Sequence, residues 1–319
     1  MQQHHWGKTF WAALPMAALI LGLSLSTAQA GPYPVSEFGA DDTLGALNHL
    51  TAENAKQAAK LVTKGKVYQL GMITGATTPA YGTRKFQMIV HQLADGTGAV
   101  IGQNNLVSND DTVITSIGIG SQLDGLGHIG RDHFYYNNRA AADVVAPDGL
   151  KIFGTEALPG IVTRGVVLDM TKHFGQTPVK AGTAYTEDDI KAAAQTQGVS
   201  ITKGDVVLLH SGYMKATEND TTLTPSEPGL GVSGAYYLAK LGVVAVGADS
   251  WALEVLPSED PMDAFPVHQI LLTEYGVYIL ENMVTEELIA DGVKEFMFTL
   301  GVPKLKGSVQ AIINPLAIR

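Results

Sequence analysis

Residues 118–128 read Gly118-Ile119-Gly120-Ser121-Gln122-Leu123-Asp124-Gly125-Leu126-Gly127-His128, which is the densest polar cluster of the chain. If this segment stays extended, the alternation of side chains along a strand sends Gln122, Asp124 and His128 to one face. An amide oxygen, a carboxylate and an imidazole on the same side form a suitable donor set for a divalent metal ion. The same spacing also fits a turn in which Gln122 and Asp124 satisfy backbone amides and His128 is packed.

A second polar cluster lies far downstream. His268 and Gln269 stand inside the apolar run 265–272, where an unpaired polar side chain would be costly to bury. Glu281 follows the hydrophobic strand predicted over 277–280, which places a carboxylate at the carboxyl end of a strand. The alternative interpretation is a hydrogen-bonded core histidine and an exposed glutamate at the end of the strand.

The composition restricts the chemistry of any site. The 319 residues contain no cysteine, which excludes disulfides, thiolate metal sites and a cysteine nucleophile. A metal ion would therefore be held by histidine, carboxylate or amide oxygen. Acidic residues outnumber basic ones by 31 to 21, which argues against a nucleic-acid-binding protein. The sequence contains no P-loop and no HExxH motif, and Gly118-Ile119-Gly120 lacks the third glycine of a dinucleotide-binding fingerprint.

The first thirty residues have the pattern of a signal peptide. Lys8 precedes an apolar run over residues 10–25, and Ala28-Gln29-Ala30 fits cleavage after Ala30. The alternative is an uncleaved anchor, but a run of about sixteen residues is shorter than the roughly 20 that span a bilayer. We therefore expect an exported protein of residues 31–319, not bound to the membrane after cleavage, periplasmic in a Gram-negative source and otherwise secreted.

The order of predicted elements indicates one α/β domain over residues 31–319. Strands cluster first and alternate with helices later, which is typical of a mixed β-sheet with helices packed against it. Helices are predicted from Thr51 to Gly65, after Thr186 and after Thr285, and at 232–241 and 267–273. The predicted strands are 66–73, 85–93, 98–107, 112–119, 161–168, 205–210, 243–247, 276–280, 296–300 and 309–313.

In this order and at this separation, the two polar clusters resemble the cyclase family of metal-dependent hydrolases, which includes bacterial kynurenine formamidase and isatin hydrolase. The family signature is HxGTHxDxPxH, and one branch reads HxGTQxDxLxH; residues 118–128 align with this branch. Segments 41–48, 164–169, 204–209 and 246–252 resemble the same branch. The resemblance therefore covers nearly all of the expected mature chain.

The resemblance implies a swivelling β/β/α fold of the kynurenine formamidase type and a divalent metal ion, Mn²⁺ or Zn²⁺. It implies that Gln122 and Asp124 are metal ligands and that His128 is a ligand or a proton shuttle. His268 corresponds to the downstream active-site histidine, and Glu281 to the glutamate that completes a second metal position in two-metal members. Gln269 is an adjacent oxygen donor that could replace a ligand.

One departure from the signature bears directly on the metal site. Gly118 stands where the signature has its first histidine, and glycine has no side chain to bind a metal. Three outcomes stay open: another residue compensates, the metal is held more weakly, or catalysis is lost. By residue type alone, His133 and His91 are the candidates for compensation.

The expected reaction is metal-assisted hydrolysis of a small amide, cyclic amide or lactone by an activated water, with His128, His268 and Glu281 as catalytic residues. The rival hypotheses are a lactonase-type member of the family and a binding protein that has lost activity. The aromatic residues predicted to line the pocket, with ordinary core packing as the alternative, are Trp251, Phe134, Tyr135, Tyr136 and Phe265. Arg84 and Arg131 could pair with a substrate carboxylate or be solvated surface groups. The family also implies a homodimer or homotetramer.

Overall fold

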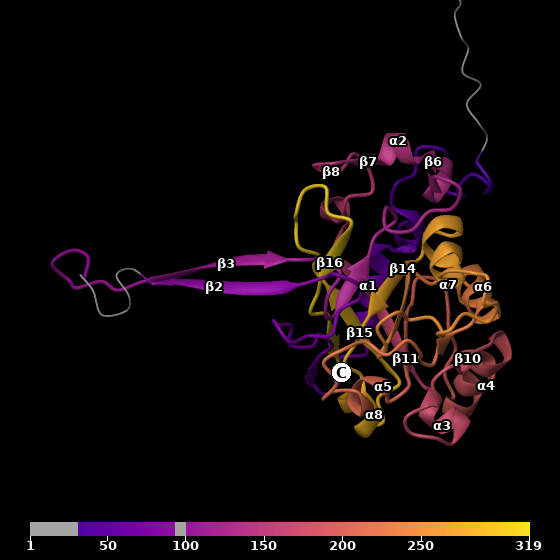
Figure 1. Cartoon of the computed structure of the whole chain (residues 1–319). Coiled ribbons are helices and arrows are strands. Elements are labelled where there is room, and N and C mark those ends of the chain that lie inside the picture. The colour runs from indigo at the N-terminus through magenta and orange to yellow at the C-terminus, as the bar shows by residue number, and fades with distance from the viewer. Residues whose placement is uncertain (1–30, 93–99) are drawn as a thin grey trace, which may run out of the picture. The chain divides into compact units, whose positions relative to one another are not determined.

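The computed structural model describes residues 31–92 and 100–319, so the predicted signal peptide lies outside the described part. Its main feature is a nine-stranded mixed sheet with the strand order β1-β17-β15-β9-β11-β13-β14-β4-β16 (Figure 1). These strands are β1 (Val67–Gln69), β4 (Gln122–Asp124), β9 (Ile161–Asp169), β11 (Val206–His210), β13 (Ala245–Ala248), β14 (Tyr278–Glu281), β15 (Glu295–Leu300), β16 (Gln310–Ile312) and β17 (Leu316–Ile318). The predicted α/β fold with one mixed sheet is thus confirmed.

The four central strands β9, β11, β13 and β14 run parallel to one another. All five residues of β11 and all four of β13 are buried. Continuous burial of this kind belongs to parallel strands that are covered on both faces, which explains their unbroken apolar runs in the sequence. The remaining neighbours in the sheet pair antiparallel, including β4 with both β14 and β16.

Helices connect and cover these strands. The longest, α4 (Glu187–Gln197), begins with a capping box between Thr186 and Asp189 and ends at Gly198, whose φ of 68° suits glycine. It packs against α6 (Val232–Lys240) and contacts β9, whereas α1 contacts β9 and β15. The other helices are η1 (Gly45–His49), α1 (Ala52–Ala59), η3 (Tyr136–Asn138), α2 (Ala141–Val144), η4 (Thr155–Ala157), α3 (Met170–Phe174), α5 (Tyr213–Ala216), α7 (Pro266–His268), the π-helical turn η5 (Gln269–Glu274) and α8 (Glu286–Ala290).

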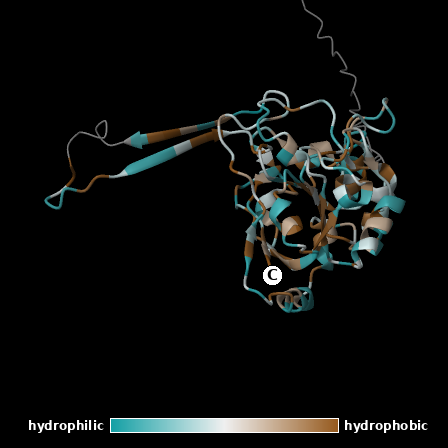
Figure 2. Ribbon diagram, turned by 90° about the horizontal axis from the view of Figure 1, so that it is seen from below, coloured by the Kyte–Doolittle hydropathy of each residue, from teal (hydrophilic) through white to brown (hydrophobic). Residues whose placement is uncertain are grey.

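One long hairpin stands apart from the main sheet. β2 (Phe86–Gln92) pairs antiparallel with β3 (Asn109–Thr115), and neither strand pairs with another described strand. The hairpin extends away from the sheet in Figure 1, and Figure 2 shows hydrophobic segments on both of its strands. The short remaining strands form three pairs: β5 (Phe134–Tyr135) with β6 (Arg139–Ala140), β7 (Val145–Ala146) with β8 (Gly149–Leu150), and β10 (Ala184–Tyr185) with β12 (Gly229–Leu230).

Several predicted elements differ from the structure; β1 (Val67–Gln69) and β3 (Asn109–Thr115), for example, end before the predicted strands 66–73 and 112–119 do. The first helix ends at Ala59 with Lys60 as its C-cap, so the predicted end at Gly65 is wrong. The predicted strand 98–107 begins outside the described residues; its described part is a turn with one isolated bridge between Ile101 and Leu106.

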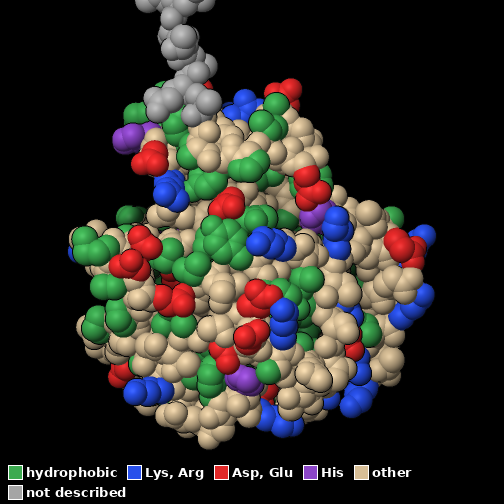
Figure 3. Space-filling model, turned by 90° about the vertical axis from the view of Figure 1, so that its right-hand side faces the viewer, with side chains coloured by type: hydrophobic (Ala, Val, Ile, Leu, Met, Phe, Trp, Pro, Cys, Tyr) green, Lys and Arg blue, Asp and Glu red, His purple; other side chains and the backbone are tan. Residues whose placement is uncertain are grey.

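Acidic and basic side chains are interspersed on the face shown in Figure 3. Within the described residues, no helix is long and apolar enough to cross a membrane.

Candidate metal and active site

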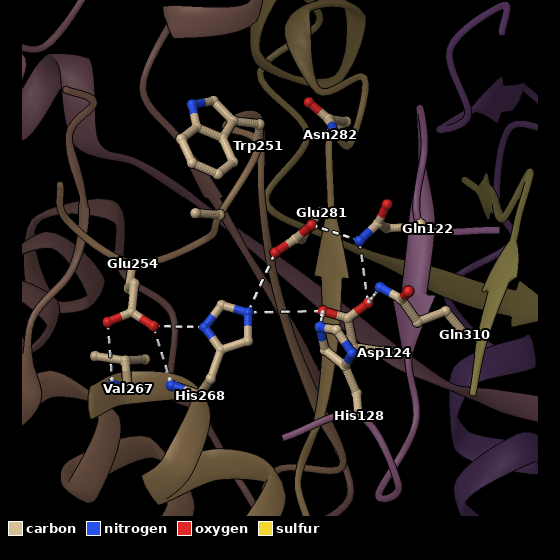
Figure 4. A network of polar contacts seen from close by, with 12 residues as sticks. Gln122, Asp124, His128, Trp251, Glu254, Val267, His268, Glu281, Asn282 and Gln310 are labelled. Carbon is tan, nitrogen blue, oxygen red and sulfur yellow. Dashed lines mark hydrogen bonds and ion pairs between the residues drawn. The ribbon is translucent and has the colours of Figure 1, made fainter. Parts of the chain in front are cut away.

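Three neighbouring strands bring four polar side chains to one face of the sheet. In the register of the sheet, Glu281 on β14 lies opposite Gln122 on β4, and Gln310 on β16 lies opposite Asp124. Directly opposed residues share a face, and Asp124 follows Gln122 by two positions, so all four side chains point the same way. Gln122 Nε2 lies 2.6 Å from Glu281 Oε2, and Gln310 Nε2 lies 2.6 Å from Asp124 Oδ1 (Figure 4). Amide groups from neighbouring strands therefore hold both carboxylates.

His128 reaches the same place by a different route. Its backbone N–H donates to the carbonyl of Gly125, which forms a turn just after β4. Its side chain returns toward the sheet, with Nε2 3.9 Å from Asp124 Oδ2. The predicted extended backbone is thus correct for Gln122 and Asp124 and wrong for His128, although all three side chains lie together.

His268 comes from the downstream cluster and is almost completely buried. Its Nδ1 lies 2.5 Å from Glu254 Oε1, and Glu254 also accepts the backbone N–H groups of Val267 and His268. Nε2 of His268 faces the two strand carboxylates, 3.6 Å from Asp124 Oδ2 and 3.3 Å from Glu281 Oε1. A carboxylate behind one ring nitrogen fixes the orientation of the imidazole and makes the other nitrogen a better ligand.

Glu254 was not among the residues predicted from the sequence. It lies in the segment Ala252-Leu253-Glu254-Val255, whose other three residues are apolar and buried. A buried carboxylate needs a partner, so a glutamate within such a segment was the available signal. The sequence could not show that the partner is His268, because the two residues meet through the tertiary fold.

Burial and neighbouring charges shift the pKa values of these groups in different directions. Burial raises the pKa of Asp124, but His128 and His268 outweigh it and bring the value to about 2. Burial and the charge of Asp124 raise the pKa of Glu281 to about 8. Burial lowers the pKa of His268, yet the neighbouring carboxyl groups of Asp124, Glu254 and Glu281 raise it well above its ordinary value. Burial lowers the pKa of His128.

The arrangement fits a divalent cation. Asp124 Oδ2 is buried without a hydrogen-bond partner among the described residues, and one ligand atom each from Asp124, His128 and His268 lie within 4.8 Å of one another. Two imidazoles and a carboxylate are ligands that Zn²⁺ and Mn²⁺ accept. Gln122 directs its amide nitrogen at the carboxylates of Asp124 and Glu281, so in this orientation it is a hydrogen-bond donor rather than the expected oxygen ligand.

Other side chains occupy the space beside Gly118. A Cβ added to Gly118 would lie 2.5 Å from Oε1 of Gln310 and 2.9 Å from Cζ of Arg84. Neither histidine considered as a replacement is there: His91 is exposed on β2 beside Thr112, and His133 is exposed in the β5 turn. The groups that occupy the space at this position are therefore a carboxamide and a guanidinium.

A cavity of about 450 Å³ opens onto the polar cluster. Trp251 and Phe265 are among its lining residues, and Tyr81 stacks on Trp251 with the ring centroids 5.6 Å apart. Its other lining residues are Arg84, Gln122, His128, Ile129, Ala252, His268 and Glu281.

The prediction is wrong for three of the aromatic residues. Phe134 and Tyr135 form β5 and pair with β6, and Tyr136 is buried against Phe153 with its hydroxyl donating to Asp42. None of the three lines the cavity that contains Trp251 and the two histidines. Side chains near a sequence motif need not face it, because the chain turns between Gly130 and Phe134.

Gln269 and Arg131 also lie away from this site. Both line a separate cavity, and Gln269 donates its amide to the carbonyl of Ala264. Successive residues of a helix point about 100° apart, so the residue after a buried His268 faces a different direction. Gln269 is therefore not placed to replace a metal ligand.

A second group of metal-ligating residue types, His210, Asp249 and Glu286, lies nearby in the fold. Asp249 is already engaged, because its carboxylate accepts the backbone N–H groups of Ser211 and Gly212 and the Ser211 hydroxyl. His210 contacts the hydroxyl of Thr285. These bonds tie the end of β11 to the end of β13, which gives the cluster a structural role.

The family follows from a direct comparison with known proteins. Residues 47–255 match the family model described as Cyclase. The chain belongs to the cyclase family. No curated protein matches the chain.

Solved structures of similar fold extend the comparison. The crystal structure of a novel cyclase is 25% identical in sequence to this chain and has a TM-score of 0.79. The match covers 88% of this chain and 96% of the chain in that structure. An isatin hydrolase bound to the product analogue thioisatinate is 19% identical with a TM-score of 0.58, over 84% of this chain and 98% of its own. Isatin hydrolase A from Ralstonia solanacearum is 17% identical with a TM-score of 0.59, over 84% of this chain and 97% of its own. These similarities show that the cyclase fold extends over most of the chain.

Proposed function

We propose that this cyclase-family protein is a metal-dependent hydrolase that cleaves a small amide, cyclic amide or lactone with water. The observation that carries the proposal is the buried, unpartnered Oδ2 of Asp124, which faces two histidines beside a cavity. An acceptor of this kind is costly to bury unless a cation or a donor completes it. The isatin hydrolases of similar fold support hydrolysis as the reaction type.

Asp124, His128 and His268 would hold the ion, which we propose is Mn²⁺ or Zn²⁺. When bound, a divalent ion supplies a Lewis acid that activates water and polarises a carbonyl group. Glu254 keeps His268 oriented with Nε2 toward the site. Gln122 and Gln310 hold the carboxylates of Glu281 and Asp124 in place through their amide groups.

Glu281 is the residue best placed to move a proton. It lines the cavity, and its Oε1 lies 3.3 Å from His268. Its pKa of about 8 leaves the carboxyl able to gain or lose a proton near neutral pH, as general acid–base catalysis requires. As water adds to the substrate carbonyl, the ionised form of Glu281 takes a proton from the water. It then delivers the proton to the leaving nitrogen or oxygen as the C–N or C–O bond breaks.

The test combines metal analysis with turnover. Purified protein should contain Mn or Zn in a fixed ratio to the chain, and Asp124→Asn should lose both the metal and the activity. A panel of N-formyl amides, cyclic amides and lactones then identifies the bond that is cleaved. Protein that stays inert on the whole panel after addition of Mn²⁺ and Zn²⁺ would contradict the proposed hydrolase.

We further propose that the hairpin of β2 and β3 pairs with a second copy of the chain. Four of its apolar side chains, Met88, Val90, Val113 and Ile114, are between 45% and 59% exposed. An isolated hairpin is marginally stable in water, and its free edges invite pairing with another strand. A dimer or tetramer in light scattering that dissociates on Val90→Asp would support this, and an unaltered oligomer would exclude the hairpin as the contact.

We propose export with removal of residues 1–30, on the basis of the apolar run and the Ala28-Gln29-Ala30 pattern. Sequencing the amino terminus of protein recovered from the source cells tests this. A mature chain that begins at Gly31 is expected, and a chain that still carries Lys8 would contradict the proposal.

A further inference from the structure

Arg84 is a partly buried cation at the edge of the active-site cavity. Its Nη1 donates to the carbonyl of Gly118 at 2.8 Å, and its guanidinium lies 5.9 Å from the centre of the Tyr81 ring. A guanidinium carries five N–H donors in a rigid fork, and this backbone bond uses one of them. Among the described residues, no carboxylate forms an ion pair with Arg84.

Arg84 borders two adjoining cavities. It lines both the 450 Å³ cavity and an adjoining one of about 210 Å³, which share Tyr81, Gln122, Trp251 and Glu281. The nearby acid Asp124 already faces the two histidines, and the carboxyl group of Glu281 already contacts Gln122 and His268.

We propose that Arg84 binds a carboxylate group of the substrate or product, and so makes this cyclase selective for acids over their uncharged analogues. Guanidinium and carboxylate match as a two-bond fork, and such charged hydrogen bonds are among the strongest in proteins. The absence of a side chain at Gly118 is what makes room for this group, since a Cβ there would come within 2.9 Å of Arg84 Cζ.

This inference rests on the proposed function for the origin of the carboxylate. Hydrolysis of an amide or lactone releases a carboxylate at the carbon that water has attacked, and this group forms in the same cavity. The carboxylate could instead belong to a part of the substrate that does not react. Both sources present the same chemistry to Arg84, and kinetics can separate them.

The binding test needs no turnover. Benzoate and its uncharged analogue benzamide are titrated calorimetrically into the full chain, once after treatment with EDTA and once with Mn²⁺ added. Arg84→Met should weaken benzoate binding by about 10- to 100-fold, as expected for a hydrogen-bonded charge, and leave benzamide binding unchanged. Arg131→Met is the matched control, because Arg131 lines a different cavity, and it should bind benzoate like the wild type.

Two further variants guard against a trivial result. Arg84→Lys keeps the charge and should bind benzoate more tightly than Arg84→Met does. If Arg84→Met were merely misfolded, it would also lose benzamide binding. Trp251 lines the same cavity, so benzoate should change the tryptophan emission of the wild type and not that of Trp251→Phe. Equal benzoate affinity in wild type and Arg84→Met in the EDTA-treated protein would overturn the proposal.

Kinetics then locate the carboxylate. If it belongs to the substrate, Arg84→Met raises KM for carboxylated substrates alone; if it belongs to the product, the substitution relieves inhibition by every acid product. The result is also separable from the proposed hydrolysis. Benzoate binding that depends on Arg84 in a protein without turnover would refute the hydrolase and leave the carboxylate site standing. Turnover in a protein that does not bind benzoate through Arg84 would support the hydrolase and refute the carboxylate site.

Discussion

His268 is held between carboxylates on both sides of its ring. Glu254 lies behind Nδ1, and Asp124 and Glu281 lie in front of Nε2. Because Glu254 also accepts two backbone N–H groups, from Val267 and His268, it ties the imidazole to the start of α7. The direction of Nε2 toward the metal site thus depends on a residue that would not itself touch the ion.

Replacing Glu254 with glutamine should weaken metal binding by about 10- to 100-fold, the usual cost of losing an outer-shell partner of a metal-bound histidine. Calorimetric titration of metal-free protein with Zn²⁺ or Mn²⁺ measures this affinity. Glu259→Gln is the control, since Glu259 is exposed and accepts the backbone N–H of Val232. Unchanged affinity in Glu254→Gln would show that the orientation of His268 does not depend on this carboxylate.

The site residues that could be predicted from the sequence are those marked by a local sequence pattern. Asp124 and His128 stand in one short motif, and His268 and Glu281 stand out as polar residues beside apolar runs. Gln310 reaches the site through strand register, which leaves no local pattern in the sequence. Glu254 stands out as a carboxylate among apolar residues, but its pairing with His268 depends on tertiary packing. Arg84 is a candidate by residue type alone, and its bond to Gly118 depends on the fold. Gly118 showed that the first histidine of the signature is missing, but only the fold shows that Gln310 and Arg84 occupy the space beside it.

At the scale of elements, the packing between β9 and β15 sets a strict limit on side-chain size. Gly165 on β9 lies directly opposite Phe296 on β15, and a Cβ at Gly165 would lie 2.2 Å from Cε2 of that ring. Phe296 is completely buried, so the ring has no open space into which to move. Glycine is therefore required here by contact with a neighbour rather than by backbone conformation.

Gly165→Ala should lower the free energy of unfolding by about 1–3 kcal/mol, the usual cost of overpacking a core. Gly301→Ala is the control, because a Cβ there meets no atom within 4 Å. Urea denaturation gives both values. In the double variant Gly165→Ala, Phe296→Leu, the loss of unfolding free energy should be smaller than the sum of the losses in the two single variants. A loss equal to that sum would contradict the proposed clash.

The elements that sequence patterns predicted well are those buried in the main sheet. Segment 161–168 became β9 and segment 205–210 became β11, since apolar stretches such as 206–209 are decisive where both faces of a strand are covered. Segment 98–107 misled because it has the composition of a strand but no sheet to join: Ile101, Leu106 and Val107 are between 49% and 65% exposed. Strand propensity reflects a half-buried surface, and that surface is absent here within the described chain.

At the scale of the whole molecule, the metal site should control how stability depends on pH. The pKa of Glu281 is raised from 4.5 to about 8, so the folded protein holds this proton more tightly than the unfolded chain does. Its stabilising contribution is complete below about pH 4.5 and is lost as the pH rises through about 8. The raised pKa of His268 acts in the same direction, and the lowered pKa of His128 acts in the opposite direction. The lowered pKa of Asp124 matters only below about pH 4.

The thermal midpoint of metal-free protein should therefore fall between about pH 5 and about pH 8. Saturating Mn²⁺ should reverse this trend, because a metal binds deprotonated ligands and its affinity rises with pH. Scanning calorimetry with EDTA and with Mn²⁺ measures both curves, and Glu281→Gln should flatten the metal-free one. A metal-free midpoint that rises with pH would contradict the assigned pKa shifts.

The base of the β2–β3 hairpin coincides with the wall of the active-site cavity. Arg84 lies two residues before β2, Gly118 lies three residues after β3, and a hydrogen bond joins their two segments. If the hairpin is covered by a second copy, self-association and the placement of Arg84 share one stretch of backbone. Catalysis would then respond to the protein's own abundance, and activity per molecule would fall when a dilute sample dissociates.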